Sequence, residues 1–193
     1  MPLTGFEQHA GNPVEKIFWG RAEIHAASAH LYFTKNSAVQ QSLHRFKYKG
    51  RKEIGLYFGK CIGHALKNSG RFQTCQLILP LPLFASREKK RGYNQATILS
   101  EGISSVMHIP VITDALVRVK GTATQTHKNR IQRWQNMANK FMIKRKEQLT
   151  GKHILLIDDV ITTGSTLEAC ALTLNRLEGV TLSIATLAHS VSG

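Results

Sequence analysis

Residues 154–166 read ILLIDDVITTGST and carry the strongest indication of the fold. Its first four residues are apolar and are typical of a strand that is buried on both faces of a parallel sheet. A helical pattern of apolar residues begins at Leu167, and Gly179 is a suitable stop for that helix. The order of strand, short loop and helix predicts an α/β protein with a central parallel sheet flanked by helices.

The loop in this stretch has the composition of an anion site. A helix start directs unpaired N–H groups and the positive end of its dipole into the preceding loop. Gly164 allows a positive φ there. Two carboxylates, Asp158 and Asp159, would repel a phosphate, so we expect them to bind vicinal sugar hydroxyls or a divalent cation. The predicted ligand is a sugar phosphate, and the hydroxyl donors for its phosphate are Thr162, Thr163, Ser165 and Thr166.

The segment DDVITTGST resembles the phosphoribosyl pyrophosphate (PRPP) motif of type I phosphoribosyltransferases. The resemblance implies that Asp158 and Asp159 bind the ribose hydroxyls and that residues 162–166 bind the 5′-phosphate. It also implies Mg²⁺, which we expect to arrive with the diphosphate near these two acids and to be held mostly by ligand oxygens and water. The alternative is a Rossmann-like strand, turn and helix without a ligand. Paired acids at a strand end argue against that alternative.

A cationic segment follows the strand predicted at residues 75–83. Ligands of open α/β sheets bind at the carboxyl ends of the strands, where this segment lies. In type I phosphoribosyltransferases a loop at this place holds the pyrophosphate of PRPP, and the alternative is a solvated surface turn. The cations are Arg87, Lys89, Lys90 and Arg91.

Residues 118–141 are polar, basic and poorly periodic, which predicts a mobile loop. Their spacing resembles that of the ComF (GntX-like) family, as do the segments RGYNQATILS and FKYKGRKEIGLYFG. The resemblance implies a loop that closes over the substrate, with Arg118 as a catalytic cation. Lys128 departs from the family pattern, which has a leucine there. The predicted loop residues are Lys120, Thr122, Gln125, Arg133 and Asn136.

A basic run interleaved with aromatic residues covers residues 44–52. Cations between rings suit the phosphates and stacked bases of single-stranded nucleic acid. The alternative is a helix end with compensating cations and a buried aromatic face. The nucleic-acid candidates are Arg45, Lys47, Tyr48, Lys49, Arg51 and Lys52.

The charge of the chain is unusual. Its 193 residues include 26 Lys and Arg but only 12 Asp and Glu, so the formal net charge is +14. Such a chain attracts polyanions, although the charge could also serve solubility alone. No apolar run approaches the ~18 residues of a membrane span, and the N-terminus does not resemble a secretory signal, so we expect a cytoplasmic protein. The three cysteines form no CxxC pair, and we expect free thiols.

Length and resemblance together predict an N-terminal hood-like helical region at residues 1–70 and a three-layer phosphoribosyltransferase core at residues 71–193. Many ComF proteins begin with a four-cysteine zinc finger, but the first cysteine here is Cys61, so we expect no zinc. The resemblance implies a role in DNA uptake during natural transformation, with single-stranded DNA, helicase and recombination partners. A homodimer is a further expectation.

Two classes of function stay open. One is an enzyme that transfers the phosphoribosyl group, either to an unidentified acceptor or to a nucleobase in nucleotide salvage. The other is a PRPP-sensing, non-catalytic protein that binds DNA. No segment of the sequence indicates a particular nucleobase.

Overall fold

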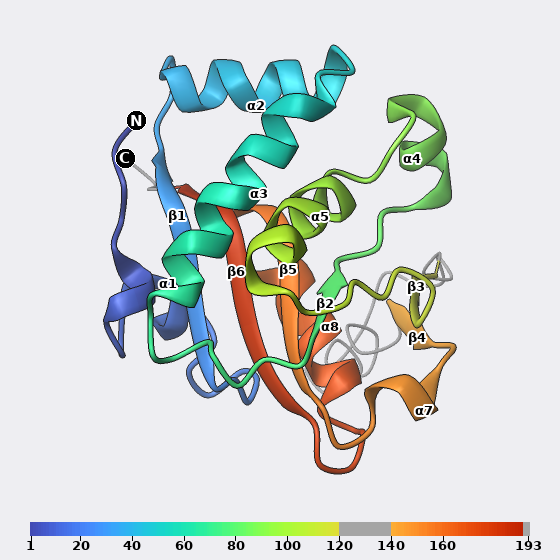
Figure 1. Cartoon of the computed structure of the whole chain (residues 1–193). Coiled ribbons are helices and arrows are strands. Elements are labelled where there is room, and N and C mark those ends of the chain that lie inside the picture. Colours follow the sequence, from blue (N-terminus) through green and yellow to red (C-terminus); the bar gives the residue numbers. More distant parts are fainter. Residues whose placement is uncertain (120–139, 191–193) are drawn as a thin grey trace, which may run out of the picture.

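Four parallel strands form the central sheet. The computed structural model describes residues 1–119 and 140–190, and in them the strands lie in the order β1-β6-β5-β2 (Figure 1). β5 lies between two neighbours, as its apolar run predicts. It continues through Asp158 and Asp159, because it stays paired with β6 up to Ile161. The strand bounds are Ala26–Phe33 (β1), Leu77–Pro80 (β2), His153–Ile161 (β5) and Thr181–Ser190 (β6).

Helices cover both faces of this sheet. Side chains of a strand alternate between the faces, so Leu155 and Ile157 join one apolar cluster whereas Ile154 and Leu156 join the other. The result is the three-layer arrangement predicted from the sequence. The first cluster is covered by α2 (Ala38–Tyr48), α3 (Lys52–Lys67) and α5 (Gln95–Met107), and the second by η1 (Phe6–Gln8), α1 (Pro13–Lys16) and α8 (Ser165–Leu174).

Helices α3 and α5 touch through their backbones. A Cβ added at Gly59 would lie 2.4 Å from the carbonyl oxygen of Leu99, and one at Gly102 would lie 2.6 Å from that of Leu56. Only glycine permits this approach, because the atoms on the other side are backbone atoms that cannot move away. This contact fixes the position of α5, which packs on β5. It thereby supports the carboxyl end of β5, where Asp158 lies.

A small antiparallel pair stands apart from the central sheet. It consists of β3 (Leu116–Arg118) and β4 (Phe141–Ile143), and α7 (Lys146–Leu149) follows it. The predicted loop residues Lys120, Thr122, Gln125, Arg133 and Asn136 lie outside the described residues. The cationic segment after β2 forms the helix α4 (Ala85–Arg91), so the expectation of a loop there is wrong.

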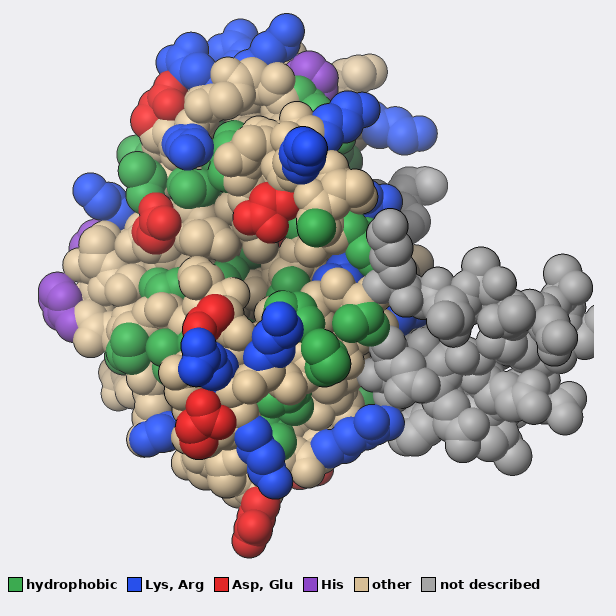
Figure 2. All heavy atoms as spheres, turned by 90° about the vertical axis from the view of Figure 1, so that its right-hand side faces the viewer, with side chains coloured by type: hydrophobic (Ala, Val, Ile, Leu, Met, Phe, Trp, Pro, Cys, Tyr) green, Lys and Arg blue, Asp and Glu red, His purple; other side chains and the backbone are tan. Residues whose placement is uncertain are grey.

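Basic side chains are spread over the face shown in Figure 2 and include a group along its top. Figure 2 shows Lys and Arg side chains along the top of the face turned to the viewer, the height at which the end of α2 and α4 lie in Figure 1. Lys49, directly after α2, and Lys89 and Lys90 of α4 are exposed. The acidic side chains in this view are fewer and are separated from one another.

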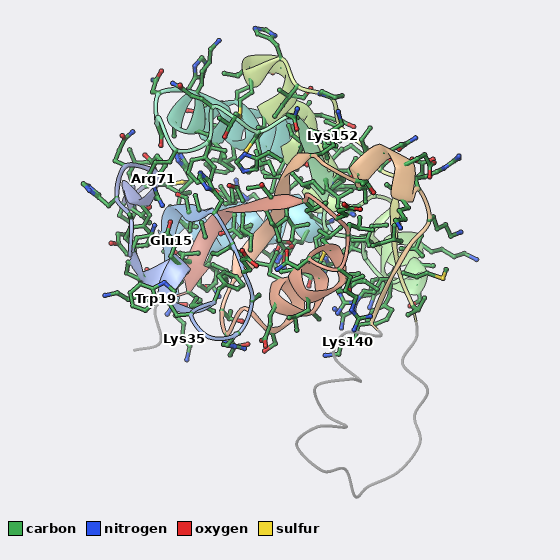
Figure 3. The ribbon with its side chains drawn as sticks, turned by 90° about the horizontal axis from the view of Figure 1, so that it is seen from below. Glu15, Trp19, Lys35, Arg71, Lys140 and Lys152 are labelled. Atoms are coloured by element: carbon green, nitrogen blue, oxygen red, sulfur yellow. The ribbon has the colours of Figure 1, made fainter. Side chains whose placement is uncertain are left out.

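The N-terminal segment is tied to the body by buried polar contacts. Glu15 forms an ion pair with Arg71 and accepts hydrogen bonds from the backbone N–H groups of Gly11 (2.6 Å) and Ala27 (3.1 Å) (Figure 3). The predicted division of the chain at residue 70 stays a prediction. Among the described residues, however, the sheet and both apolar clusters include residues from both sides of it.

The cysteines are free thiols, and Cys75 and Cys170 are buried whereas Cys61 is half-buried. Burial raises the pKa of the Cys75 thiol to about 12 and also raises that of Cys170, so neither buried thiol is a nucleophile at neutral pH. Within the described part of the chain, no helix is both long enough and apolar enough to cross a membrane.

Candidate functional site

The loop after β5 encloses a hollow of about 70 Å³, here called the loop hollow. Its walls are Asp158 and residues 160–167, so the structure brings one predicted sugar-binding acid together with all five predicted phosphate-binding residues. Gly164 has a φ of +71° and directly precedes α8. The predicted phosphate-binding residues in the wall are Thr162, Thr163, Gly164, Ser165 and Thr166.

The two adjacent acids turn to opposite faces of the sheet. Asp158 lies on the side of Arg118, whose charge acts on its carboxyl group, and of Cys170, whose pKa the Asp158 carboxylate helps to raise. Asp159 lies on the side of α2, where its Oδ2 is 2.9 Å from Nζ of Lys47. The backbone N–H of Asp159 donates to Oδ1 of Asp158 at 2.8 Å. The carboxylates therefore flank the strand end from two sides, as a ligand seated across that end would require.

The pKa of the Asp158 carboxyl group is raised. Burial and the neighbouring Asp159 raise the pKa of Asp158 from 3.8 to about 7. The hydrogen bond from Asp159 and the charges of Lys47 and Arg118 oppose this rise without cancelling it. The unliganded site therefore disfavours two ionised carboxylates. Hydroxyl donors or a cation from a ligand would stabilise them.

Arg118, the predicted catalytic cation, lies beside this pair between two aromatic rings. Its guanidinium carbon is 4.2 Å from the ring centre of Phe84 and 5.6 Å from that of Phe141. Its Nε is buried and has no hydrogen-bond partner among the described residues. Burial and the nearby Arg87 lower the pKa of Arg118, whereas Asp158 acts in the other direction. The stacking holds a donor-rich group near Asp158.

Arg21 holds the loop in place, and no pattern in the sequence predicts this role. Its Nη1 donates to the carbonyl oxygens of Thr163 (3.2 Å) and Ile17 (3.1 Å), and its Nη2 forms an ion pair with the buried Glu168 of α8. Arg21 and Thr163 are 142 positions apart, so no local pattern could relate them. A basic residue that follows an exposed turn resembles any surface cation until the fold is known.

The predicted pyrophosphate-binding cations lie on α4, and their side chains point in two directions. Arg87, Lys89 and Lys90 are exposed, and Arg87 lies 5.8 Å from the ring centre of Phe84, the same ring that Arg118 covers. Arg91 turns the other way. It donates to Oε1 of Gln95 at 2.7 Å, and its guanidinium carbon lies 5.3 Å from the ring centre of Tyr48.

The predicted nucleic-acid residues meet where α2 ends and α3 begins, a surface here called the α2–α3 corner. The ring of Tyr48, 57% exposed, lies 5.1 Å from that of His44, and Lys52 lies 5.2 Å from the ring centre of Tyr93. Lys47 does not belong to this surface, because it is paired with Asp159. The assignment of Lys47 as a nucleic-acid contact stays a prediction, which this ion pair does not support. The residues of the corner are Arg45, Tyr48, Lys49, Arg51 and Lys52.

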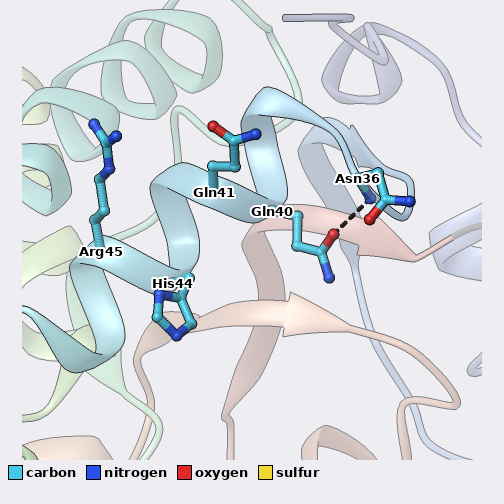
Figure 4. A pocket seen from close by; sticks show the side chains of 5 residues that line it. All are labelled: Asn36, Gln40, Gln41, His44 and Arg45. Atoms are coloured by element: carbon cyan, nitrogen blue, oxygen red, sulfur yellow. Dashed lines mark hydrogen bonds between the residues drawn. The ribbon is translucent and has the colours of Figure 1, made fainter.

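An open hollow of about 360 Å³ lies along α2 next to this corner (Figure 4). Its side chains present amide, imidazole and guanidinium groups, all of which form hydrogen bonds with base edges or phosphates. The Gln40 side chain is held by the backbone N–H of Asn36, which donates to its Oε1 at 2.6 Å. The lining residues are Asn36, Gln40, Gln41, His44 and Arg45.

The donor set fits a hard cation that brings most of its own ligands. The described residues contain no group of three or more His, Cys, Asp or Glu side chains arranged to hold a metal ion. Asp158 and Asp159 offer carboxylate oxygens, which Mg²⁺ prefers, but they lie on two sides of the strand end. A magnesium ion that shares the oxygens of a bound diphosphate is compatible with this arrangement.

Comparison with known proteins identifies the family. Residues 89–192 match the phosphoribosyl transferase domain family, and the chain belongs to it. The predictions of a type I phosphoribosyltransferase relative and of its three-layer fold are thereby confirmed. Among solved structures, the adenine phosphoribosyl transferase from Trypanosoma brucei has a TM-score of 0.48 and 14% identity, with 82% of each chain covered.

Two curated relatives refine this assignment. Competence protein F of Haemophilus influenzae is 33% identical over 180 residues, which cover 91% of this chain and 76% of that protein. The DNA utilization protein YhgH of Escherichia coli O157:H7 is 31% identical over 146 residues, which cover 74% of this chain and 63% of that protein. The chain thus spans less than two thirds of the length of the second relative. The similarity to competence protein F confirms the predicted resemblance to ComF proteins.

Proposed function

We propose that this protein binds PRPP with Mg²⁺ at the end of β5, binds single-stranded DNA at the α2–α3 corner, and acts in DNA uptake. The loop hollow carries the first part of the proposal, because Asp158 and residues 162–166 line it together. The ribose hydroxyls bind Asp158 and Asp159. The 5′-phosphate binds the loop and the start of α8, which Arg21 holds in place.

Three sets of cations suit the diphosphate. Arg118 lies near Asp158, and the guanidinium carbon of Arg87 lies 5.8 Å from the ring centre of Phe84, on which Arg118 also packs. Lys89 and Lys90 extend from α4 into solvent, where they attract a polyanion. Mg²⁺ bound with the diphosphate would neutralise part of the charge on the leaving group. Loss of one such fixed donor typically costs on the order of 10²-fold in rate.

The names of the relatives and the charge of this chain support the DNA part. Competence protein F is named for competence and YhgH for DNA utilization. The net charge of +14 exceeds what one PRPP molecule requires. The exposed Tyr48 offers a ring on which a base can stack, and Arg45 and Lys49 offer charges for the adjoining phosphates.

A single set of measurements tests this proposal. Calorimetry with PRPP and Mg²⁺ measures the first site, and anisotropy of a labelled oligothymidine at several salt concentrations measures the second. We expect both ligands to bind and the DNA affinity to fall steeply with salt. Absence of PRPP binding, or DNA binding that does not depend on salt, would contradict the proposal.

The same preparation separates the two classes of function. Release of pyrophosphate on adding PRPP with a nucleobase would identify a salvage enzyme. A DNA affinity that changes with PRPP, without pyrophosphate release, would identify a PRPP-sensing regulator. Transfer to a different acceptor would appear as pyrophosphate release that requires DNA or another added nucleophile.

A further inference from the structure

Lys47 differs from the cations on either side of it. Its Nζ lies 2.9 Å from Oδ2 of Asp159, and the two side chains are only 21% and 13% exposed. Lys49 and Arg45, which lie two positions away, are exposed. One cation of the basic run therefore reaches the end of β5, although the sequence places it among nucleic-acid contacts.

The position of Lys47 is fixed by its neighbours on α2. Phe46 is fully buried, and its carbonyl oxygen accepts a hydrogen bond from the hydroxyl of Tyr93. Leu43, one turn earlier, is also buried. Because this face of α2 is packed on the core, the last turn cannot rotate. The Lys47 side chain is therefore directed at the strand end.

The ion pair has a consequence for Asp159. A carboxylate has two oxygens and accepts about four hydrogen bonds. Lys47 engages Oδ2, which orients the group and compensates its charge, and Oδ1 is left for a ligand hydroxyl. Without this cation, Asp159 would stand beside Asp158 with its charge uncompensated and its rotamer unrestrained.

We propose that Lys47 is a positioning residue of the sugar site, which holds Asp159 for a ribose hydroxyl, and that it does not contact the nucleic acid. This inference rests on the proposed function. It differs from a role as a diphosphate-binding cation, because Lys47 acts through a carboxylate that faces the sugar. The two roles predict different losses for the separate halves of PRPP.

The test uses calorimetry of the full chain with PRPP, ribose 5-phosphate and pyrophosphate, the first and last with Mg²⁺. Lys47→Met should lower the affinity for PRPP and for ribose 5-phosphate by at least about tenfold, the effect of one charge-assisted hydrogen bond. The affinity for pyrophosphate should stay unchanged. Lys47→Arg should restore most of the loss. Lys60→Met, which removes an exposed lysine from α3, is the matched control and should match the wild type.

A second measurement concerns the DNA. Lys47→Met should leave the salt dependence of oligothymidine binding as in the wild type, whereas Lys49→Met should lower its slope by about 0.7, the value for one phosphate contact of a single strand. If Lys47→Met does not fold, as judged by thermal unfolding, Lys47→Gln takes its place in both measurements.

Three results would overturn the inference. An equal loss of pyrophosphate affinity would make Lys47 a diphosphate cation. A salt slope lowered as much as by Lys49→Met would return it to the nucleic-acid surface. Unchanged affinity for ribose 5-phosphate would remove the positioning role while the wild type still binds PRPP. A wild type that binds neither PRPP nor ribose 5-phosphate would instead remove the proposed function, and the inference with it.

Discussion

At the scale of single residues, the site opposes stability. A half-buried carboxyl group next to a second carboxylate is unfavourable in its ionised form, and Asp158 is held in that position by β5. The ionised pair therefore lowers the stability of the unliganded protein, and a bound ligand would offset this loss. The charges of Lys47 and Arg118 offset this loss only in part.

Replacing Asp158 by Asn should therefore stabilise the unliganded protein. The folded-state pKa of about 7 exceeds the ordinary 3.8, so between these values the folded state binds more protons than the unfolded state, and stability falls as pH rises. We expect Asp158→Asn to raise the Tm relative to wild type above neutral pH and to match it at acid pH. Each kcal/mol corresponds to about 2–4 °C. A difference in Tm that does not vary with pH would contradict the raised pKa.

Arg21 provides a second prediction at this scale. Arg21→Met removes the donor to the Thr163 carbonyl and leaves the buried Glu168 without its cation. We expect a loss of about 1–3 kcal/mol in the free energy of unfolding and weaker PRPP binding. Adding Glu168→Gln should recover stability but not PRPP affinity. Recovery of both would show that Arg21 serves the fold alone, and denaturant unfolding with calorimetry measures the two.

At the scale of elements, the sequence predicted what depends on local apolar pattern. The strand β5 ends directly before the predicted phosphate-binding loop, and α8 begins within that loop at Ser165, because apolar spacing in each segment is a local property. The helix α4 was missed because none of its residues is buried, so it has no apolar face to detect. The partners of Lys47 and Arg21 were missed because the fold, not the spacing, brings them to the site.

The contact between α3 and α5 can be tested directly. Gly59→Ala places a methyl group 2.4 Å from the carbonyl oxygen of Leu99, and neither backbone can yield without separating the helices. We expect destabilisation by about 1–3 kcal/mol, the usual effect of overpacking. Gly70→Ala is the control, since nothing lies within 4 Å of its added Cβ. Equal unfolding midpoints for the two variants would contradict the close approach.

At the scale of the whole molecule, the paired acids and the excess of cations lie in different regions. The acids and the loop lie at the carboxyl end of β5, whereas cations outnumber acids at the α2–α3 corner and in α4. The helix α2 belongs to both regions, because Lys47 faces β5 and Tyr48 faces solvent. The composition predicted the excess of positive charge but not its position.

Neutralising this surface should change how DNA binding depends on salt. Lys49→Gln with Lys52→Gln removes two exposed cations of the α2–α3 corner and should lower the slope by about 1.4, or about 0.7 for each phosphate contact. Lys146→Gln with Lys152→Gln, two exposed cations that precede β5, is the matched control and should leave the slope unchanged. Equal effects of the two pairs would mean that DNA binds through net charge rather than at the corner.

The most direct measurement is calorimetry of PRPP with Mg²⁺ on the wild type and on the variant with both Asp158→Asn and Asp159→Asn. We predict binding to the wild type and no detectable binding to the variant, whose Tm should be no lower than that of the wild type because the repulsion between the acids is gone. Equal affinity of the two proteins for PRPP would contradict the claim that these carboxylates hold the sugar.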